Sequence, residues 1–95
     1  MTNVTIRYGP HSYCLTSIGH AGTTASCAGV SALVQALAGW VHNGHSGGIS
    51  LDKGEAVIAI PEQDGADAVM DLITIGLLQI QKAAPDDVSV KVEIS

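Results

Sequence analysis

Hydrophobic and polar positions near the start of the chain alternate with a period of two residues. Val4, Ile6 and Tyr8 alternate with polar neighbours, which is typical of a half-buried β-strand. Gly9-Pro10 then marks a turn, and residues 13–18 read as a second strand. We therefore expect these two strands to form a hairpin.

The middle and the end of the chain repeat this strand signature. Residues 49–51 and 55–60 are rich in aliphatic side chains and flank Asp52-Lys53-Gly54, a composition that favours a tight turn. Pro61 ends this second predicted hairpin. After Pro85-Asp86-Asp87, residues 88–94 alternate again and close the chain as a strand.

Two segments show the helical period instead. We expect the first helix to begin near Ser26, with the hydroxyl of Ser26 or Thr24 as its cap, and to end at Asn43-Gly44. Its apolar stripe comprises Val30, Leu33, Val34, Leu37 and Val41.

The second predicted helix runs from about Gly65 to Ala83, with Asp64 as its cap. Its core stripe comprises Ala66, Val69, Met70, Ile73, Leu77 and Ile80. A second apolar set, Leu72, Ile75 and Leu78, projects elsewhere on the same helix. Either a homodimer contact or burial under a loop would account for this second set.

These elements follow the order ββαββαβ. Residues 1–95 therefore form one predicted α/β (α+β) domain, with two helices packed on a mixed or antiparallel sheet. Aromatic residues make up only 3% of the chain and Phe is absent, so the core must be aliphatic.

Charge is distributed unevenly along the sequence. The formal net charge is −5, and Arg7 is the only Asp, Glu, Lys or Arg residue before Asp52. With four Lys plus Arg residues the chain offers no basic stripe for phosphates, so we expect no nucleic-acid partner, whereas a basic peptide would be attracted. Polar residues interrupt the apolar run of the C-terminal half and no targeting leader is evident, so we expect no membrane span and a cytoplasmic location.

Candidate chemistry centres on Cys27, which is preceded by His20 in a loop of small residues. A cysteine in the first turn of a helix sits at the positive end of the helix dipole, where a thiolate is favoured. A nearby imidazole can exchange a proton near neutral pH. We interpret His20 and Cys27 as a catalytic pair on the edge of the apolar stripe, with a buried structural cysteine as the alternative. For Cys14, in mid-strand, inert packing is the better interpretation.

Other residues near this pair have two interpretations each. Ser31, one turn beyond Cys27, is either a hydrogen-bonding partner behind the site or part of the helix packing. Gly22 either gives the loop flexibility for peptide entry or marks a turn, and Gly19 ends the preceding strand.

The remaining candidate sites are weak. His42 and His45 have a ligand-like spacing, but no cysteine lies close in sequence, so we predict no metal site. The glycines between Gly44 and Gly48 match neither the P-loop nor the dinucleotide fingerprint. No carboxylate pair for acid–base catalysis is evident.

Two short blocks, Gly19-His20-Ala21 and Cys27-Ala28-Gly29-Val30-Ser31-Ala32-Leu33, give the chain a family resemblance. Together with the chain length and element order, they resemble the Prp (YsxB-like) family of ribosomal-processing cysteine proteases. The resemblance implies that His20 and Cys27 form the catalytic dyad. It also implies a homodimer without a cofactor. Its substrate would be a basic N-terminal extension of a ribosomal protein precursor, or a phage structural protein.

The chain departs from this family before the cysteine. Many relatives have a longer loop and Asp-Ile-Val there, whereas this chain has Thr24-Ala25-Ser26. We assign Gly19, Gly22, Thr23 and Thr24 to the substrate loop, and the backbone N–H of Cys27 or Ala28 to the oxyanion. The competing hypothesis is a non-catalytic homodimeric binding module with structural Cys27 and His20.

Overall fold

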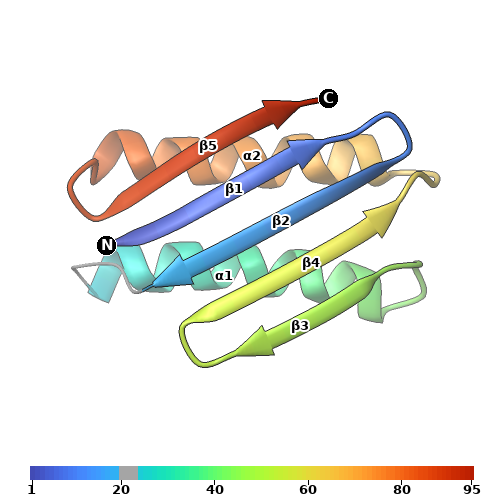
Figure 1. Ribbon diagram of the computed structural model, residues 1–95. Helices are drawn as coiled ribbons and strands as arrows, with labels where there is room; N and C mark the ends of the chain where they lie inside the picture. The colour runs from blue at the N-terminus through green and yellow to red at the C-terminus, as the bar shows by residue number, and fades with distance from the viewer. Residues whose placement is uncertain (20–23) are drawn as a thin grey trace.

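The computed structural model describes residues 1–19 and 24–95. It confirms the predicted order ββαββαβ and the single α+β architecture (Figure 1). The elements are β1 (Thr2–Tyr8), β2 (Ser12–Gly19), α1 (Thr24–His42), β3 (Gly48–Asp52), β4 (Glu55–Pro61), α2 (Ala66–Ala83) and β5 (Val88–Ile94).

The five strands form one mixed sheet in the order β3-β4-β2-β1-β5. Both predicted hairpins are present as antiparallel pairs, β1 with β2 and β3 with β4. β2 also pairs antiparallel with β4, whereas β5 lies parallel to β1. The sheet edges are therefore β3 on one side and β5 on the other.

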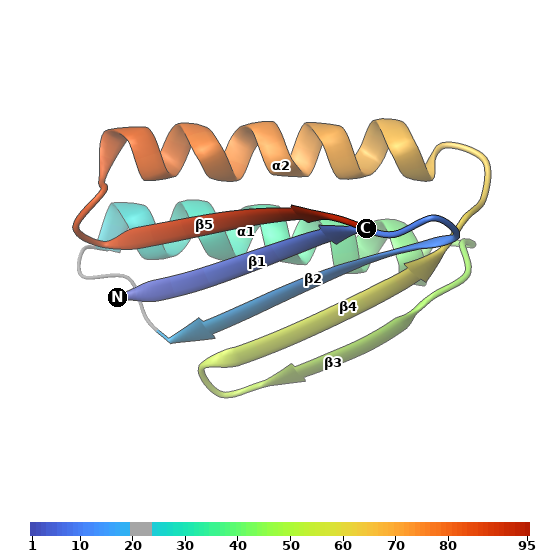
Figure 2. The same cartoon turned by 45° about the horizontal axis from the view of Figure 1, so that its top comes forward.

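Both helices cover the same face of the sheet (Figures 1 and 2). Alternation along β1 and β2 explains this arrangement, because every second residue of each strand is buried and faces the helices. The core is almost entirely aliphatic, as the composition predicts. Its fully buried large side chains are Ile6, Leu15, Leu37, Ile58, Ile60, Met70 and Leu77.

The predicted stripes of both helices are confirmed, but the predicted caps are not. α1 begins at Thr24, so Ser26 and Thr24 both lie within the helix and neither occupies the N-cap position before it. The prediction of an Asp64 cap is also wrong, because α2 has Gly65 at its N-cap and no side-chain capping bond. Gly65 adopts φ of 86°, a left-handed conformation open to glycine, so the chain enters α2 through backbone geometry instead.

The second apolar set of α2 is open to solvent in the single chain. Leu72 is 69% exposed, Ile75 57% and Leu78 37%. Burial under a loop, one of the two explanations for this set, is therefore wrong. A contact with a second copy of the chain remains a prediction.

By length and composition, residues 25–42 of α1 would suffice to cross a membrane. The expectation of no membrane span rests on the C-terminal half alone, whereas this segment lies in the N-terminal half. In the fold its apolar stripe is turned inward, with Val30, Val34, Leu37 and Val41 buried in the core. α1 thus buries one apolar face against the sheet and α2 and leaves its other face exposed.

Candidate active site

Cys27 lies in the first turn of α1, as predicted, and its thiol is free and exposed. The sequence pattern placed this residue at the edge of the apolar stripe as a half-buried side chain. In the structure this side chain is exposed rather than half-buried. A thiol in this position is accessible to a substrate.

The acidic side chain near the N-terminus of α1 comes from a distant part of the sequence. α1 carries no acidic residue in its first turn. The buried Ser26 hydroxyl instead donates to Asp87 Oδ2 at 3.4 Å, and the Asp87 carbonyl accepts a hydrogen bond from Thr2 N at 2.9 Å. Asp87 therefore joins the start of α1 to the start of β1, close to Cys27.

The earlier start of α1 changes which backbone amides are available to an oxyanion. In an α-helix the N–H groups of the first residues precede the first intrahelical bond. For α1 these are the amides of Thr24, Ala25 and Ser26, whereas those of Cys27 and Ala28 belong to the helical ladder. The assignment of Ala28 as oxyanion donor is therefore disfavoured, and the amides before Cys27 are better placed.

Gly19 ends β2 immediately before His20 and is held tightly. Its amide donates to the Gly54 carbonyl at 2.8 Å, and its φ is +98°. A Cβ atom built at Gly19 would collide with the Met1 carbonyl oxygen. Only glycine fits here, so the backbone that leads into the predicted substrate loop has a fixed starting point.

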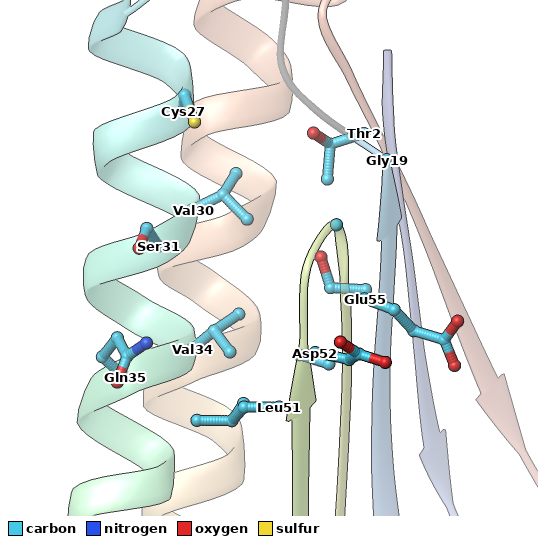
Figure 3. Close-up of a pocket in the computed structure, with 13 residues that line it drawn as sticks. Thr2, Gly19, Cys27, Val30, Ser31, Val34, Gln35, Leu51, Asp52 and Glu55 are labelled. Atoms are coloured by element: carbon cyan, nitrogen blue, oxygen red, sulfur yellow. The ribbon is translucent and has the colours of Figure 1, made fainter.

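His20, Gly22 and Thr23 lie outside the described residues. The His20–Cys27 pairing and the substrate-loop roles of these residues therefore stay predictions. Thr24 is the first residue of α1. Of the sequence-predicted residues, the structure brings together Gly19, Cys27 and Ser31, which line one cavity (Figure 3).

This cavity has a volume of about 280 Å³ and lies between α1 and the sheet. From α1 it is lined by Cys27, Val30, Ser31, Val34 and Gln35, which recur at intervals of three and four residues and so share one helix face. From the sheet and the β3–β4 turn it is lined by Thr2, Ser17, Gly19, Leu51, Asp52, Gly54, Glu55 and Ala56.

The two acidic residues at the cavity rim do not point into it. In the strand register, Asp52 of β3 pairs with Glu55 of β4, and Glu55 also pairs with Ile18 of β2. The side chains at these positions lie on the sheet face opposite the helices. Figure 3 shows the Glu55 carboxylate directed away from α1. The other side chains that line the cavity are uncharged.

Sequence analysis missed Thr2 and Ser17 as residues of the cavity. Both occupy positions in phase with the buried residues of β1 and β2, and they are 3% and 8% exposed. A hydroxyl at an inward position of an otherwise apolar strand face was the available signal. The alternation identified the face, but the pairing that brings it to Cys27 depends on the tertiary fold.

The other candidate residues lie elsewhere. Cys14 is half-buried on the open face of the sheet, so it is not a core residue. His45 stacks on the Trp40 indole with ring centroids 3.8 Å apart, and its Nδ1 lies 2.6 Å from the Trp40 carbonyl oxygen. Within residues 1–19 and 24–95 no three His, Cys, Asp or Glu side chains gather as metal ligands would.

Comparison with known proteins finds structural but not sequence relatives. No protein-family model matches the chain, and no curated protein is similar enough in sequence to count as a relative. Among solved structures, the essential ribosomal processing protease Prp from S. aureus in complex with a covalently linked product peptide matches with a TM-score of 0.82 and 18% identity. The match covers 98% of this chain and 100% of that one.

Two further structures agree. Prp from S. aureus in complex with a substrate peptide matches with a TM-score of 0.80 at 17% identity, over 98% of this chain and all of that one. SMU.848 from Streptococcus mutans matches with a TM-score of 0.72 at 19% identity, over 100% and 96% of the two chains. This chain therefore has the fold of the Prp protease along its whole length, as the sequence resemblance implied.

Proposed function

We propose that this protein is a cysteine endopeptidase of the Prp type. It would remove an N-terminal extension from a bacterial ribosomal protein precursor or cut a phage structural protein. The observation that carries the proposal is the exposed Cys27 thiol in the first turn of α1, at the wall of a cavity, in a fold shared with a peptide-bound protease. A cytoplasmic location and the absence of a cofactor belong to the same proposal.

In the proposed first step, the Cys27 thiolate attacks the carbonyl carbon of the scissile peptide bond. The N-terminal amides of α1 stabilise the oxyanion that forms, an effect worth roughly 3 kcal/mol for a donor in hydrolases. The C–N bond then breaks as the His20 imidazolium gives its proton to the leaving amine. The acyl group is left on sulfur as a thioester.

In the second step, neutral His20 takes a proton from water, and the resulting hydroxide attacks the thioester carbonyl. The C–S bond breaks, the carboxylate product leaves, and Cys27 returns as a thiolate beside the imidazolium. Hydrolysis first gives the carboxylic acid, which loses its proton to the released amine, so the cycle consumes one water molecule and needs no further reactant.

A peptide cleavage assay tests this function. A synthetic peptide spanning the N-terminal extension of the host's own ribosomal protein precursor is incubated with the wild-type chain and with single variants. We expect Cys27→Ala and His20→Ala to reduce kcat by at least a thousandfold, because the nucleophile or its proton carrier is lost. Cys14→Ser is the matched control and should cleave normally. Cleavage by Cys27→Ala would contradict the proposed mechanism, and cleavage by none of the proteins would exclude the ribosomal precursor as the substrate.

The apolar outer face of α2 supports a homodimer as part of the proposed function. Leu72, Ile75 and Leu78 form an exposed apolar row on one helix, which a soluble chain would bury against a second copy. The competing function, a non-catalytic homodimeric binding module, uses the same face but predicts an unreactive Cys27. The two functions are therefore distinguished by the thiol.

A further inference from the structure

The outer edge of β3 (Gly48–Asp52) is one of the two free edges of the sheet. All five of its residues are exposed, and β4 is its only strand neighbour within the described part of the chain. A free strand edge carries main-chain N–H and C=O groups that can pair with another extended chain.

The pairing of β4 determines which β3 groups point outward. The Gly54 carbonyl accepts a hydrogen bond from the Gly19 amide, so Gly54 faces β2. Orientation alternates along an antiparallel strand, so Glu55 faces β3 and exchanges hydrogen bonds with its partner Asp52. The same alternation directs the amide and carbonyl of Ser50 toward β4.

Ile49 and Leu51 therefore turn their main-chain N–H and C=O groups away from the sheet. Their side chains lie on the helix-facing side, because they pair with the buried Ile58 and Ala56. Leu51 lines the same cavity as Cys27, and Figure 3 shows it facing α1. The free edge of β3 is thus continuous with the candidate active site.

Two buried residues with hydroxyl groups also line the cavity. Ser17 and Thr2 are more than nine-tenths buried and line it, and neither hydroxyl has a hydrogen-bond partner among residues 1–19 and 24–95. No fully enclosed side-chain polar atom in this part of the chain lacks a partner, so each of these hydroxyls keeps some accessible surface, and both residues line the cavity. Unpartnered hydroxyls in such a place fit a polar ligand such as a peptide backbone.

We propose that the substrate binds as an extended peptide whose main chain pairs with Ile49 and Leu51 on the β3 edge while its scissile carbonyl lies at Cys27. This inference rests on the proposed function, because Cys27 must be the nucleophile. The cavity face of α1 runs from Cys27 to Gln35, roughly 12 Å at the helical rise. An extended chain covers that length with about four residues.

Two peptide probes that alkylate Cys27 test the pairing in a Cys14→Ser background. Tetra-alanine chloromethyl ketone places a peptide on the acyl side of the scissile bond, and chloroacetyl-tetra-alanine amide places one on the leaving-group side. Alanine leaves recognition to the backbone. Amide hydrogen exchange is then measured by NMR on the free and the alkylated protein, with iodoacetamide-alkylated protein as the control.

We expect one of the two peptides to slow exchange at Ile49 and Leu51 by at least tenfold, whereas iodoacetamide does not. Ser50 and Asp52 are internal references, because their amides already pair with β4 and should change little. The peptide that gives protection identifies the half of the substrate that pairs with β3. Unchanged exchange at Ile49 and Leu51 with both peptides would overturn the pairing.

Leu51→Pro and Leu51→Ala separate the backbone from the side chain. Proline is tolerated on an edge strand where the amide faces outward, and it removes only that donor. For each variant, the rate of alkylation by the peptide is divided by the rate of alkylation by iodoacetamide. We expect this ratio to be roughly two- to tenfold lower for Leu51→Pro than for Leu51→Ala. Equal ratios would contradict the pairing, whereas a Cys27 inert to iodoacetamide would contradict the proposed function as well.

Discussion

At the scale of single residues, the region around Cys27 depends on positions where one residue type is required. Gly19 combines a left-handed backbone with direct contact against the Met1 carbonyl. Ser26 is buried and bonded to Asp87, and Cys27 beside it is exposed. Each of these residues performs a different physical task at the start of α1 or at the cavity beside it.

Gly19→Ala should be strongly destabilising. The left-handed conformation costs an alanine about 1 kcal/mol or more, and its Cβ would also force the β1 terminus away. We expect the free energy of unfolding, measured with urea, to fall by roughly 2–4 kcal/mol.

Gly44→Ala is the matched control for this change. Gly44 has φ of +105°, but a Cβ there would meet nothing within 4 Å. Its cost should be only the backbone strain of roughly 1 kcal/mol. Equal losses in the two variants would show that the contact with Met1 carries no weight.

At the scale of elements, the sequence predicts the interior of each helix and strand better than its ends. The stripes of α1 and α2 follow from the helical period, which many residues specify together. The ends depend on few residues, and tertiary contacts decide them: Ser26 bonds to Asp87 rather than capping α1, and Gly65 replaces Asp64 at α2.

The candidate site likewise contains residues that the sequence identifies and residues that only the tertiary fold identifies. Cys27 is identified from local position, because a cysteine at a helix start is visible in the sequence. Thr2, Ser17 and Leu51 reach the cavity only through strand pairing, which no local pattern specifies.

Tyr8 ties β1 to α2 and makes their contact sensitive to alkali. Its hydroxyl donates to Asp71 Oδ1 at 2.9 Å and lies 2.8 Å from Thr74 Oγ1, which can donate to it. Burial raises the pKa of Tyr8 above its ordinary value, with the Asp71 carboxylate adding to the shift. A raised pKa means that Tyr8 stabilises the fold below the unfolded-state value, and that this contribution is lost as pH rises through the folded value.

Tyr8→Phe should therefore cost roughly 1 kcal/mol in urea denaturation at pH 8, because the hydrogen bonds are lost. As the pH rises beyond the ordinary tyrosine pKa of about 10 and through the raised value of folded Tyr8, the difference between wild type and variant should shrink. A difference that stays constant over this pH range would contradict this role.

At the scale of the whole molecule, the sheet has one face covered by helices and two edges with different surroundings. The β3 edge borders the cavity with Cys27, whereas the β5 edge lies beside α2. Exposed apolar side chains occur near both edges, with Leu51 on β3 and Val92 and Ile94 on β5. We propose that the first region binds substrate and that the outer face of α2 binds a second copy of the chain.

Ile75→Glu tests the proposed homodimer. A carboxylate placed among Leu72 and Leu78 would have to be desolvated on association, so the dissociation constant should rise at least tenfold. Analytical ultracentrifugation over a concentration series measures this change. Ser12→Glu adds the same charge on the open sheet face and should leave association unchanged; a monomeric wild type, or equal effects of the two changes, would rule out this interface.

The central claim is that Cys27 is activated by His20, and the pH dependence of Cys27 alkylation tests it most directly. Iodoacetamide rates are measured in a Cys14→Ser background, with and without His20→Ala. The account predicts rapid alkylation below pH 7 that is lost in the His20→Ala variant. A rate that rises only near the ordinary thiol pKa of about 8.5, and that is unchanged by His20→Ala, would contradict it.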